Sequence, residues 1–92
     1  MKVEFIDRFN KYLEKIKDQE LRNSIAAVIK SLEEAEKLSE INNLRKLTGF
    51  KNDYRIRVGN YRTGIHFENN TLSLVRFAHR KDIYKIFPEI IF

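Results

Sequence analysis

The stretch YRIRVGNYRTGIHF, residues 54–67, carries the clearest structural signal in this chain. In its first part apolar and basic residues alternate, and an extended strand sends neighbouring side chains to opposite faces of a sheet. We therefore expect Tyr54, Ile56 and Val58 on one face. Arg55 and Arg57 are then expected together on the other face.

The dipeptide Gly59-Asn60 divides this stretch into two strands. Both residue types tolerate positive φ, and such a pair is typical of a tight hairpin. The chain then returns as a strand over Tyr61–Glu68, which places Arg62 on the same face as the two earlier arginines. Because the planar guanidinium group matches phosphate geometry, the hairpin is predicted to present a basic surface to a phosphate backbone.

The chain beyond the hairpin is expected to continue the sheet. Asn69-Asn70 predicts a second turn, followed by a strand over about Thr71–Ala78. Lys81–Phe87 is expected to form a final helical turn that stops before Pro88, because the residue before a proline avoids the α region. The apolar tail, residues 89–92, is expected either to pack on the core or to meet a partner.

The first half of the chain changes from strand to helix periodicity. Lys2–Phe5 alternates weakly and predicts a short edge strand, and from Ile6 apolar residues recur at three- and four-residue steps. Asp18 is expected to cap a second helix. A loop at residues 39–43 ends that helix, and Leu44–Phe50 leads into the first long strand. The apolar positions of the two helices are Phe5, Phe9, Tyr12, Leu13, Ile16, Leu21, Ile25, Val28, Ile29, Leu32 and Ala35.

These elements give the order β-α-α-β-β-β with a short C-terminal helical turn. The expected fold class is α+β, with a two-helix hairpin packed on one face of an antiparallel sheet. A length of 92 residues predicts a single domain that covers residues 1–92.

Composition limits the classes of function. The chain has no cysteine, which excludes disulfides and thiolate metal sites. No apolar run approaches the roughly 20 residues that cross a bilayer, and no signal-peptide core is present, so a cytoplasmic protein without membrane association is expected. The net charge is +5, and residues 48–92 hold eight Lys or Arg against four Asp or Glu. Either a polyanionic partner or an ordinary solvated basic face accounts for this excess.

Three motifs together resemble a known family. They are Leu44-x-x-Leu47-x-Gly49, then YRIRVGNYR at residues 54–62, then HRKDIY at residues 79–84. With these motifs the chain resembles the RelE/ParE superfamily of bacterial type II toxin–antitoxin toxins, and the RelE-like branch is favoured. The resemblance covers almost the whole chain.

The resemblance implies a small toxin with a fold like that of microbial ribonucleases, held inactive by a cognate antitoxin. A RelE-like toxin is a metal-independent endoribonuclease that cleaves mRNA in the ribosomal A site and inhibits translation. A ParE-like toxin poisons DNA gyrase instead, and a non-catalytic RNA- or partner-binding module on the same fold is a third alternative. No cofactor is implied. The antitoxin is expected to cover the basic face or to displace the terminal segment, because a disordered acidic chain can fold onto such a surface.

The expected catalytic set follows from residue-wise match to the family. It consists of Arg55, Arg57, Arg62, Arg80 and Tyr84. The best-known members have lysines at the positions of Arg55 and Arg57. Arginine stays protonated, so these two side chains are expected to hold phosphate rather than to remove a proton. Metal-free cleavage needs a base for the 2′-hydroxyl, and Tyr84 or His79 is the expected base.

Structural roles also fit several of these residues. Tyr84 fits a half-buried aromatic residue that anchors the terminal turn, and the favoured role of His79 is hydrogen bonding or capping. His66 is expected to contact a polar neighbour across the strands. The two histidines lack a close acidic helper, so no metal site is expected. Further expected RNA-binding residues, each also compatible with a solvated surface, are Lys46, Lys51, His79 and Lys81.

Overall fold

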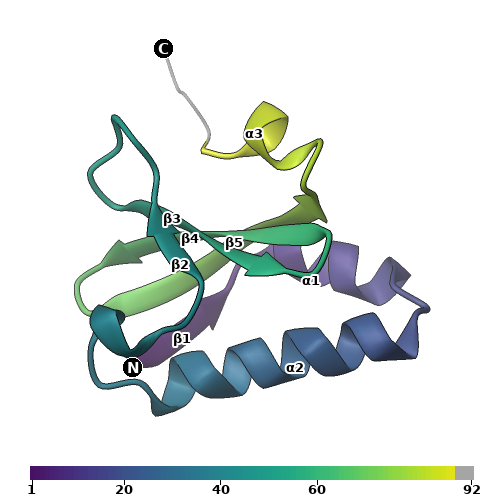
Figure 1. The fold of residues 1–92 in the computed structure, drawn as a ribbon, viewed down its shortest axis with the longest axis horizontal. Helices are drawn as coiled ribbons and strands as arrows, with labels where there is room; N and C mark the ends of the chain where they lie inside the picture. Colours follow the sequence, from purple (N-terminus) through teal and green to yellow (C-terminus); the bar gives the residue numbers. More distant parts are fainter. Residues whose placement is uncertain (89–92) are drawn as a thin grey trace.

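The computed structural model describes residues 1–88 and contains two helices on one face of a five-stranded sheet. The elements are β1 (Lys2–Phe5), α1 (Asp7–Lys15), α2 (Gln19–Glu34), a 3₁₀ turn (Leu38–Glu40), β2 (Leu44–Lys46), β3 (Asp53–Val58), β4 (Tyr61–Glu68), β5 (Thr71–His79) and α3 (Ile83–Ile86). The strands are arranged in the order β1-β5-β4-β3-β2. Figure 1 shows α1 and α2 below the sheet and α3 above it. The α+β class and the two-helix layer are therefore as predicted.

Both predicted hairpins are present, with the predicted turns. Val58 pairs with Tyr61, and Gly59 between them has a φ of +59°. At the second turn Asn69 and Asn70 have φ values of 52° and 58°. Asparagine is one of the few residue types with a side chain that enters this left-handed region readily. The two turns fix the register of β3, β4 and β5, and this register decides which side chains share a face.

The main core lies between the sheet and the two long helices. Ile56 and Val58 of β3 and Ile65 of β4 point into it, as the alternation predicts. Thr63 is buried in the same layer, and its hydroxyl donates a hydrogen bond of 2.9 Å to the carbonyl oxygen of Arg76. The helices contribute the buried side chains of Phe9, Ile25 and Leu32, and their C-cap residues contribute those of Ile16 and Ala35.

Two features of the sheet differ from the simple antiparallel arrangement. β1 lies at one edge, as expected, but it runs parallel to β5, so the sheet is mixed. At the other edge β2 adds a strand within a segment that was expected only to lead into β3. A three-residue strand is too short to show a periodicity, and pairing between the first and last strands depends on contacts far apart in sequence.

The connection between the two long helices is held by side chains from α2. The Asp18 carboxylate accepts hydrogen bonds from the amides of Glu20 and Leu21, which confirms it as the N-cap. The Arg22 guanidinium donates to the carbonyl oxygens of Leu13 and Ile16, at 3.4 and 2.8 Å. Arg22 therefore supplies a donor to the carbonyl of Ile16, the C-cap residue of α1, and a second donor to the Leu13 carbonyl, which also accepts from the Ile16 amide.

A second, smaller apolar cluster lies on the opposite face of the sheet. Ile83 and Phe87 from the α3 segment pack against Ala78 of β5, with Leu47 and Val75 at the margin. The predicted terminal turn is thus present, and it covers part of the face that carries the arginines. The predicted role of the tail, residues 89–92, lies outside the described residues. Within residues 1–88, no helix is long and apolar enough to cross a membrane.

Candidate RNA-binding site

An open pocket with a volume of about 470 Å³ lies on the sheet face opposite the long helices. Its lining residues are Asn43, Leu44, Arg45, Arg55, Arg57 and Arg62. We call it the arginine pocket. Four of the six lining residues carry a guanidinium group, and among residues 1–88 no acidic side chain lines it. Such a pocket attracts an anion.

The strand register explains why the arginines meet. Arg45 of β2 lies opposite Arg55 of β3, and Arg57 of β3 lies opposite Arg62 of β4. Side chains directly opposite each other in an antiparallel pair share a face and lie about 5 Å apart at Cβ. Three short strands therefore place four positive charges side by side.

Arg62 is the most constrained of the four arginines. Its guanidinium donates to the carbonyl oxygens of Gly59 and Tyr61, at 2.9 and 2.8 Å, so the side chain folds back over the hairpin turn. Partial burial, and then the positive charges of Arg55 and Arg57, lower its pKa. Like charges that crowd together favour a bound anion, because an anion relieves their mutual repulsion.

Arg80 and Tyr84 are the two members of the predicted catalytic set that do not line this pocket. Tyr84 acts on the pKa of Arg62 in the raising direction and Arg80 in the lowering direction, so both lie within electrostatic range of Arg62. The Arg80 amide donates a 2.8 Å hydrogen bond to the carbonyl oxygen of Asn60, which holds the chain after β5 against the β3–β4 turn. Tyr84 is 59% exposed, so it does not anchor the terminal turn. Arg55, Arg57 and Arg62 thus meet in the arginine pocket. Arg80 is tied through its amide to the β3–β4 turn, and Tyr84 lies in α3 above the sheet.

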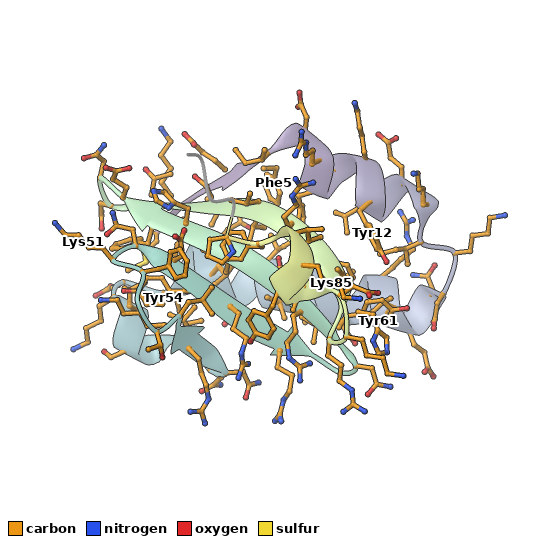
Figure 2. The ribbon with its side chains drawn as sticks, turned by 90° about the horizontal axis from the view of Figure 1, so that it is seen from above. Phe5, Tyr12, Lys51, Tyr54, Tyr61 and Lys85 are labelled. Carbon is orange, nitrogen blue, oxygen red and sulfur yellow. The ribbon has the colours of Figure 1, made fainter. Side chains whose placement is uncertain are left out.

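Lys46 and Lys51 lie elsewhere. Lys46 is opposite Tyr54, so by strand alternation it projects toward the other side of the sheet from Arg45. Both lysines line a separate surface hollow formed by the β2–β3 loop, residues 46–51. Figure 2 shows Lys51 well away from Lys85 of α3. The arginine pocket and these two lysines are therefore distinct parts of the surface.

His79 and Lys81 lie at the end of β5. The His79 ring meets the edge of Tyr61 at a centroid distance of 5.4 Å, and its Nδ1 accepts a hydrogen bond from the Lys81 amide at 3.2 Å. Tyr61 in turn stacks on Phe77 of the main core. His79 thus lies on the helix side of the sheet, and the hydrogen-bonding role favoured for it is confirmed. Lys81 is exposed in the turn before α3.

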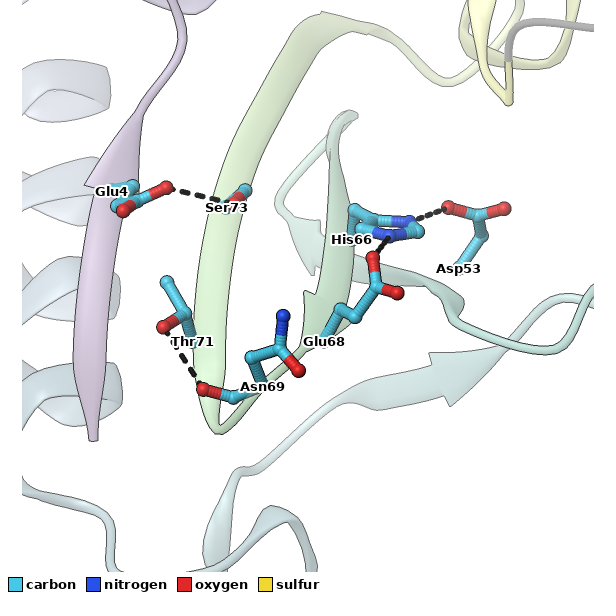
Figure 3. Close-up of polar contacts among 7 residues, drawn as sticks. All are labelled: Glu4, Asp53, His66, Glu68, Asn69, Thr71 and Ser73. Atoms are coloured by element: carbon cyan, nitrogen blue, oxygen red, sulfur yellow. Dashed lines mark hydrogen bonds and ion pairs between the residues drawn. The ribbon is translucent and has the colours of Figure 1, made fainter.

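His66 is held between two carboxylates, as Figure 3 shows. Its Nδ1 lies 2.8 Å from Asp53 Oδ1, across the strands, and its Nε2 lies 3.1 Å from Glu68 Oε2. The hydrogen bond to Asp53 raises the pKa of His66, burial opposes this, and Glu68 adds to the rise. The expected polar cross-strand partner is confirmed, whereas the expectation that His66 lacks a close acidic neighbour is wrong. Among residues 1–88 no group of three or more His, Asp or Glu side chains is placed to hold a metal ion.

Arg45 and its neighbour Asn43 also line the arginine pocket, although neither was predicted as a site residue from the sequence. The sequence contains a weak signal for Arg45, since Leu44-Arg45 repeats the apolar–basic alternation of β3. That signal becomes useful only once Leu44 is known to pair with Ile56.

Comparisons with known proteins place this geometry in a family. The sequence is 38% identical, over 96% of this chain and the full length of the relative, to Toxin RelE3 of Methanocaldococcus jannaschii. The structure matches the toxin–antitoxin complex RelB–RelE of Methanococcus jannaschii with a TM-score of 0.77 at 35% identity, over 92% of this chain and 99% of the matched chain. An archaeal RelE–RelB complex from Pyrococcus horikoshii has the same fold, with a TM-score of 0.69 at 19% identity over 89% of this chain and 97% of the matched chain. No family model matches.

The chain belongs to the RelE family of toxins, within the RelE/ParE superfamily. Its identity to the curated relative extends over nearly the whole length of both chains. The family resemblance noted from the sequence is thereby confirmed.

Proposed function

We propose that this toxin is a metal-independent endoribonuclease that cleaves mRNA in the ribosomal A site and so inhibits translation in the cytoplasm. The observation that carries the proposal is the arginine pocket, in which four guanidinium groups face one open space and no acidic side chain among residues 1–88 lines it. The exposed phenol of Tyr84 lies within electrostatic range of Arg62. A phosphate binding site next to a group that can exchange a proton suits RNA phosphodiester cleavage.

The reaction divides naturally between these side chains. The RNA 2′-hydroxyl loses a proton and attacks the adjacent phosphorus, the bond to the 5′-oxygen breaks, and that oxygen takes up a proton. Negative charge grows on the phosphoryl oxygens as the attack proceeds, and Arg55, Arg57 and Arg62 would stabilise it. Arg80 adds positive charge within electrostatic range of Arg62. Tyr84 is the candidate for proton transfer, because the arginines stay protonated and His79 is turned toward Tyr61.

We also infer that a cognate antitoxin binds this chain. The support is that a solved structure 35% identical to it is a complex of toxin RelE with antitoxin RelB. An acidic segment that enters the arginine pocket, or that lifts α3 from the sheet, would block RNA by competing for the same charges. Lys46, Lys51, His79 and Lys81 stay candidates for further RNA or ribosome contacts.

The test is primer extension on a defined mRNA positioned on purified ribosomes, after addition of the purified toxin. Wild type should cut within the A-site codon. Arg57→Ala should slow cutting by about 10²-fold or more, since a lost electrostatic contact to the transition state costs that much. Tyr84→Phe should slow it by about 10²–10⁴-fold, the usual range for general acid–base catalysis.

Lys11→Ala is the matched control, because it removes one positive charge from the exposed side of α1 and leaves the arginine pocket intact. It should cut like wild type. RNA that is bound but uncut by wild type would instead identify a binding module. Arrest of DNA synthesis before translation in cells that express the toxin would favour the gyrase-directed alternative and contradict the proposal.

A further inference from the structure

The place where α3 meets the sheet is shaped around a single glycine. Gly64 lies in the middle of β4 and is buried, on the face that carries the arginines. A Cβ atom added there would lie 2.5 Å from Cδ2 and Cγ of Phe87 and 2.8 Å from Cε2. Carbon atoms in ordinary contact are about 3.5–4 Å apart, so no other residue type leaves room for the ring in this position.

Phe87 in turn holds the α3 segment against the sheet. It is 3% exposed, Ile83 is fully buried, and the Phe87 amide donates a 2.9 Å hydrogen bond to the carbonyl oxygen of Ile83. Residues four positions apart lie on the same face of a helical turn, so Ile83 and Phe87 both point down onto the sheet. Figures 1 and 2 show α3 lying over the sheet in this position.

The same turn directs Tyr84 away from the sheet. Tyr84 follows Ile83 by one residue, which rotates its side chain about 100° around the helix axis. It is accordingly exposed, and it lies within electrostatic range of Arg62 on the neighbouring part of the sheet. The location of the phenol therefore depends on how deeply Phe87 sits above Gly64.

We propose that Gly64 and Phe87 act as positioning residues: the bare backbone of Gly64 receives the Phe87 ring and thereby sets the height and orientation of α3, and with it the position of Tyr84 relative to the arginine pocket. This inference rests on the proposed nuclease function. Neither residue touches the RNA. Their effect passes through Tyr84, whose displacement by about 1 Å would cost as much as 10²-fold in rate.

The test measures single-turnover cleavage of ribosome-bound mRNA at increasing toxin concentration. Gly64→Ala should lower the maximal rate by about 10²-fold and leave the half-saturating concentration within about twofold, because the arginine pocket is unchanged. Ser73→Ala is the matched control, a side-chain truncation on the neighbouring strand, opposite His66. It should leave both quantities unchanged. A maximal rate of Gly64→Ala close to that of wild type would overturn the inference.

Two double variants separate positioning from a general loss of structure. Once Phe87→Ala has removed the ring, adding Gly64→Ala should cause no further loss, because the clash no longer exists. In a Tyr84→Phe protein, Gly64→Ala should likewise leave the residual rate unchanged. Equal losses in the presence and absence of the Tyr84 hydroxyl would contradict the inference. Should Gly64→Ala not fold, Phe87→Ala alone must show the same dependence on Tyr84.

A readout that does not require cleavage distinguishes failure of this inference from failure of the proposed function. In a ¹H–¹⁵N NMR spectrum, Gly64→Ala should shift the amide resonances of residues 83–87 and leave those of α1 and α2 in place. Unmoved resonances would show that the Phe87 ring does not pack on Gly64. Wild-type protein that cuts no RNA would instead refute the nuclease proposal. Shifted resonances of residues 83–87 would still establish that Phe87 packs on Gly64.

Discussion

Arg57 and Arg62 illustrate what single residues contribute to this molecule. They lie directly opposite each other on β3 and β4, an arrangement of like charges that destabilises a sheet. The repulsion between the two guanidinium groups is weaker when the side chains point apart. Arg62 turns away from Arg57 because its guanidinium donates hydrogen bonds to the carbonyl oxygens of Gly59 and Tyr61. Crowded positive charge of this kind is typical of an anion site. The meeting of Arg55, Arg57 and Arg62 was predictable from sequence, because alternation and a two-residue turn determine their faces.

His66 offers a prediction at the same scale that is independent of the nuclease proposal. Its contacts with Asp53 and Glu68 raise its pKa above the ordinary value of 6.5. A pKa that is higher in the folded than in the unfolded state stabilises the fold below the unfolded value. That contribution is lost as the pH rises through the folded-state pKa. The His66 side chain is 38% exposed, so the effect should not exceed about 1 kcal/mol.

The measurement is the free energy of unfolding in urea from pH 5.5 to pH 8.5, for wild type and His66→Gln. Wild type should be more stable at the acidic end, and the difference should shrink as the pH rises. Asp53→Asn removes the first partner and should weaken the pH dependence. A difference that grows with pH would show that the sign is wrong.

At the scale of elements, short segments are what sequence patterns describe least well. β2 has three residues and α3 has four, too few for a periodicity to emerge. β2 is nevertheless the strand that brings Arg45 to the arginine pocket. α3 was predicted as a terminal turn over Lys81–Phe87 that stops before Pro88, but the packing of Phe87 over Gly64 was not predicted. The long, periodic helices and both hairpins were predicted, because each repeats its signal over several turns or pairs.

The contact between the two long helices gives a prediction about stability. Arg22→Ala removes the donor that reaches the carbonyl oxygens of Leu13 and Ile16 at the end of α1. Loss of these charge-assisted hydrogen bonds should lower the free energy of unfolding by about 1–2 kcal/mol. Urea denaturation followed by circular dichroism would measure it. Lys30→Ala breaks only an exposed pair with Glu34 and should cost less than about 0.5 kcal/mol.

At the scale of the whole molecule, the two faces of the sheet have different roles: one builds the apolar core and the other presents the arginines. One face packs on α1 and α2 and supplies most of the apolar core. The other carries the arginine pocket and the small α3 cluster. Because a sheet exposes alternate side chains of every strand to each face, one set of strands builds the core and presents the charges at once. The positions of the arginines on one face therefore say more about a binding partner than the net charge of +5 does.

Arg45 and Lys46 test this separation with neighbouring residues on opposite faces of β2. Each alanine variant removes one positive charge. Arg45→Ala should weaken binding of a non-cleavable single-stranded RNA and reduce the slope of log affinity against log salt by about 0.7, the value of one phosphate contact. Lys46→Ala should change the slope less. Equal losses of RNA affinity in both variants would mean that the electrostatic field of the whole protein, rather than the arginine pocket, holds the RNA.

The sequence by itself determined the class of fold, the hairpins, the Asp18 cap of α2 and the shared face of three arginines, because these depend on neighbours within a few residues. It also carried the family motifs. Only the tertiary structure decided that β1 runs parallel to β5, that Arg45 joins the arginine pocket and that His79 turns away from it. The packing of the Phe87 ring on Gly64 was likewise decided only by the fold. These outcomes depend on contacts between segments up to about 70 residues apart, whose geometry is determined only when the whole core packs.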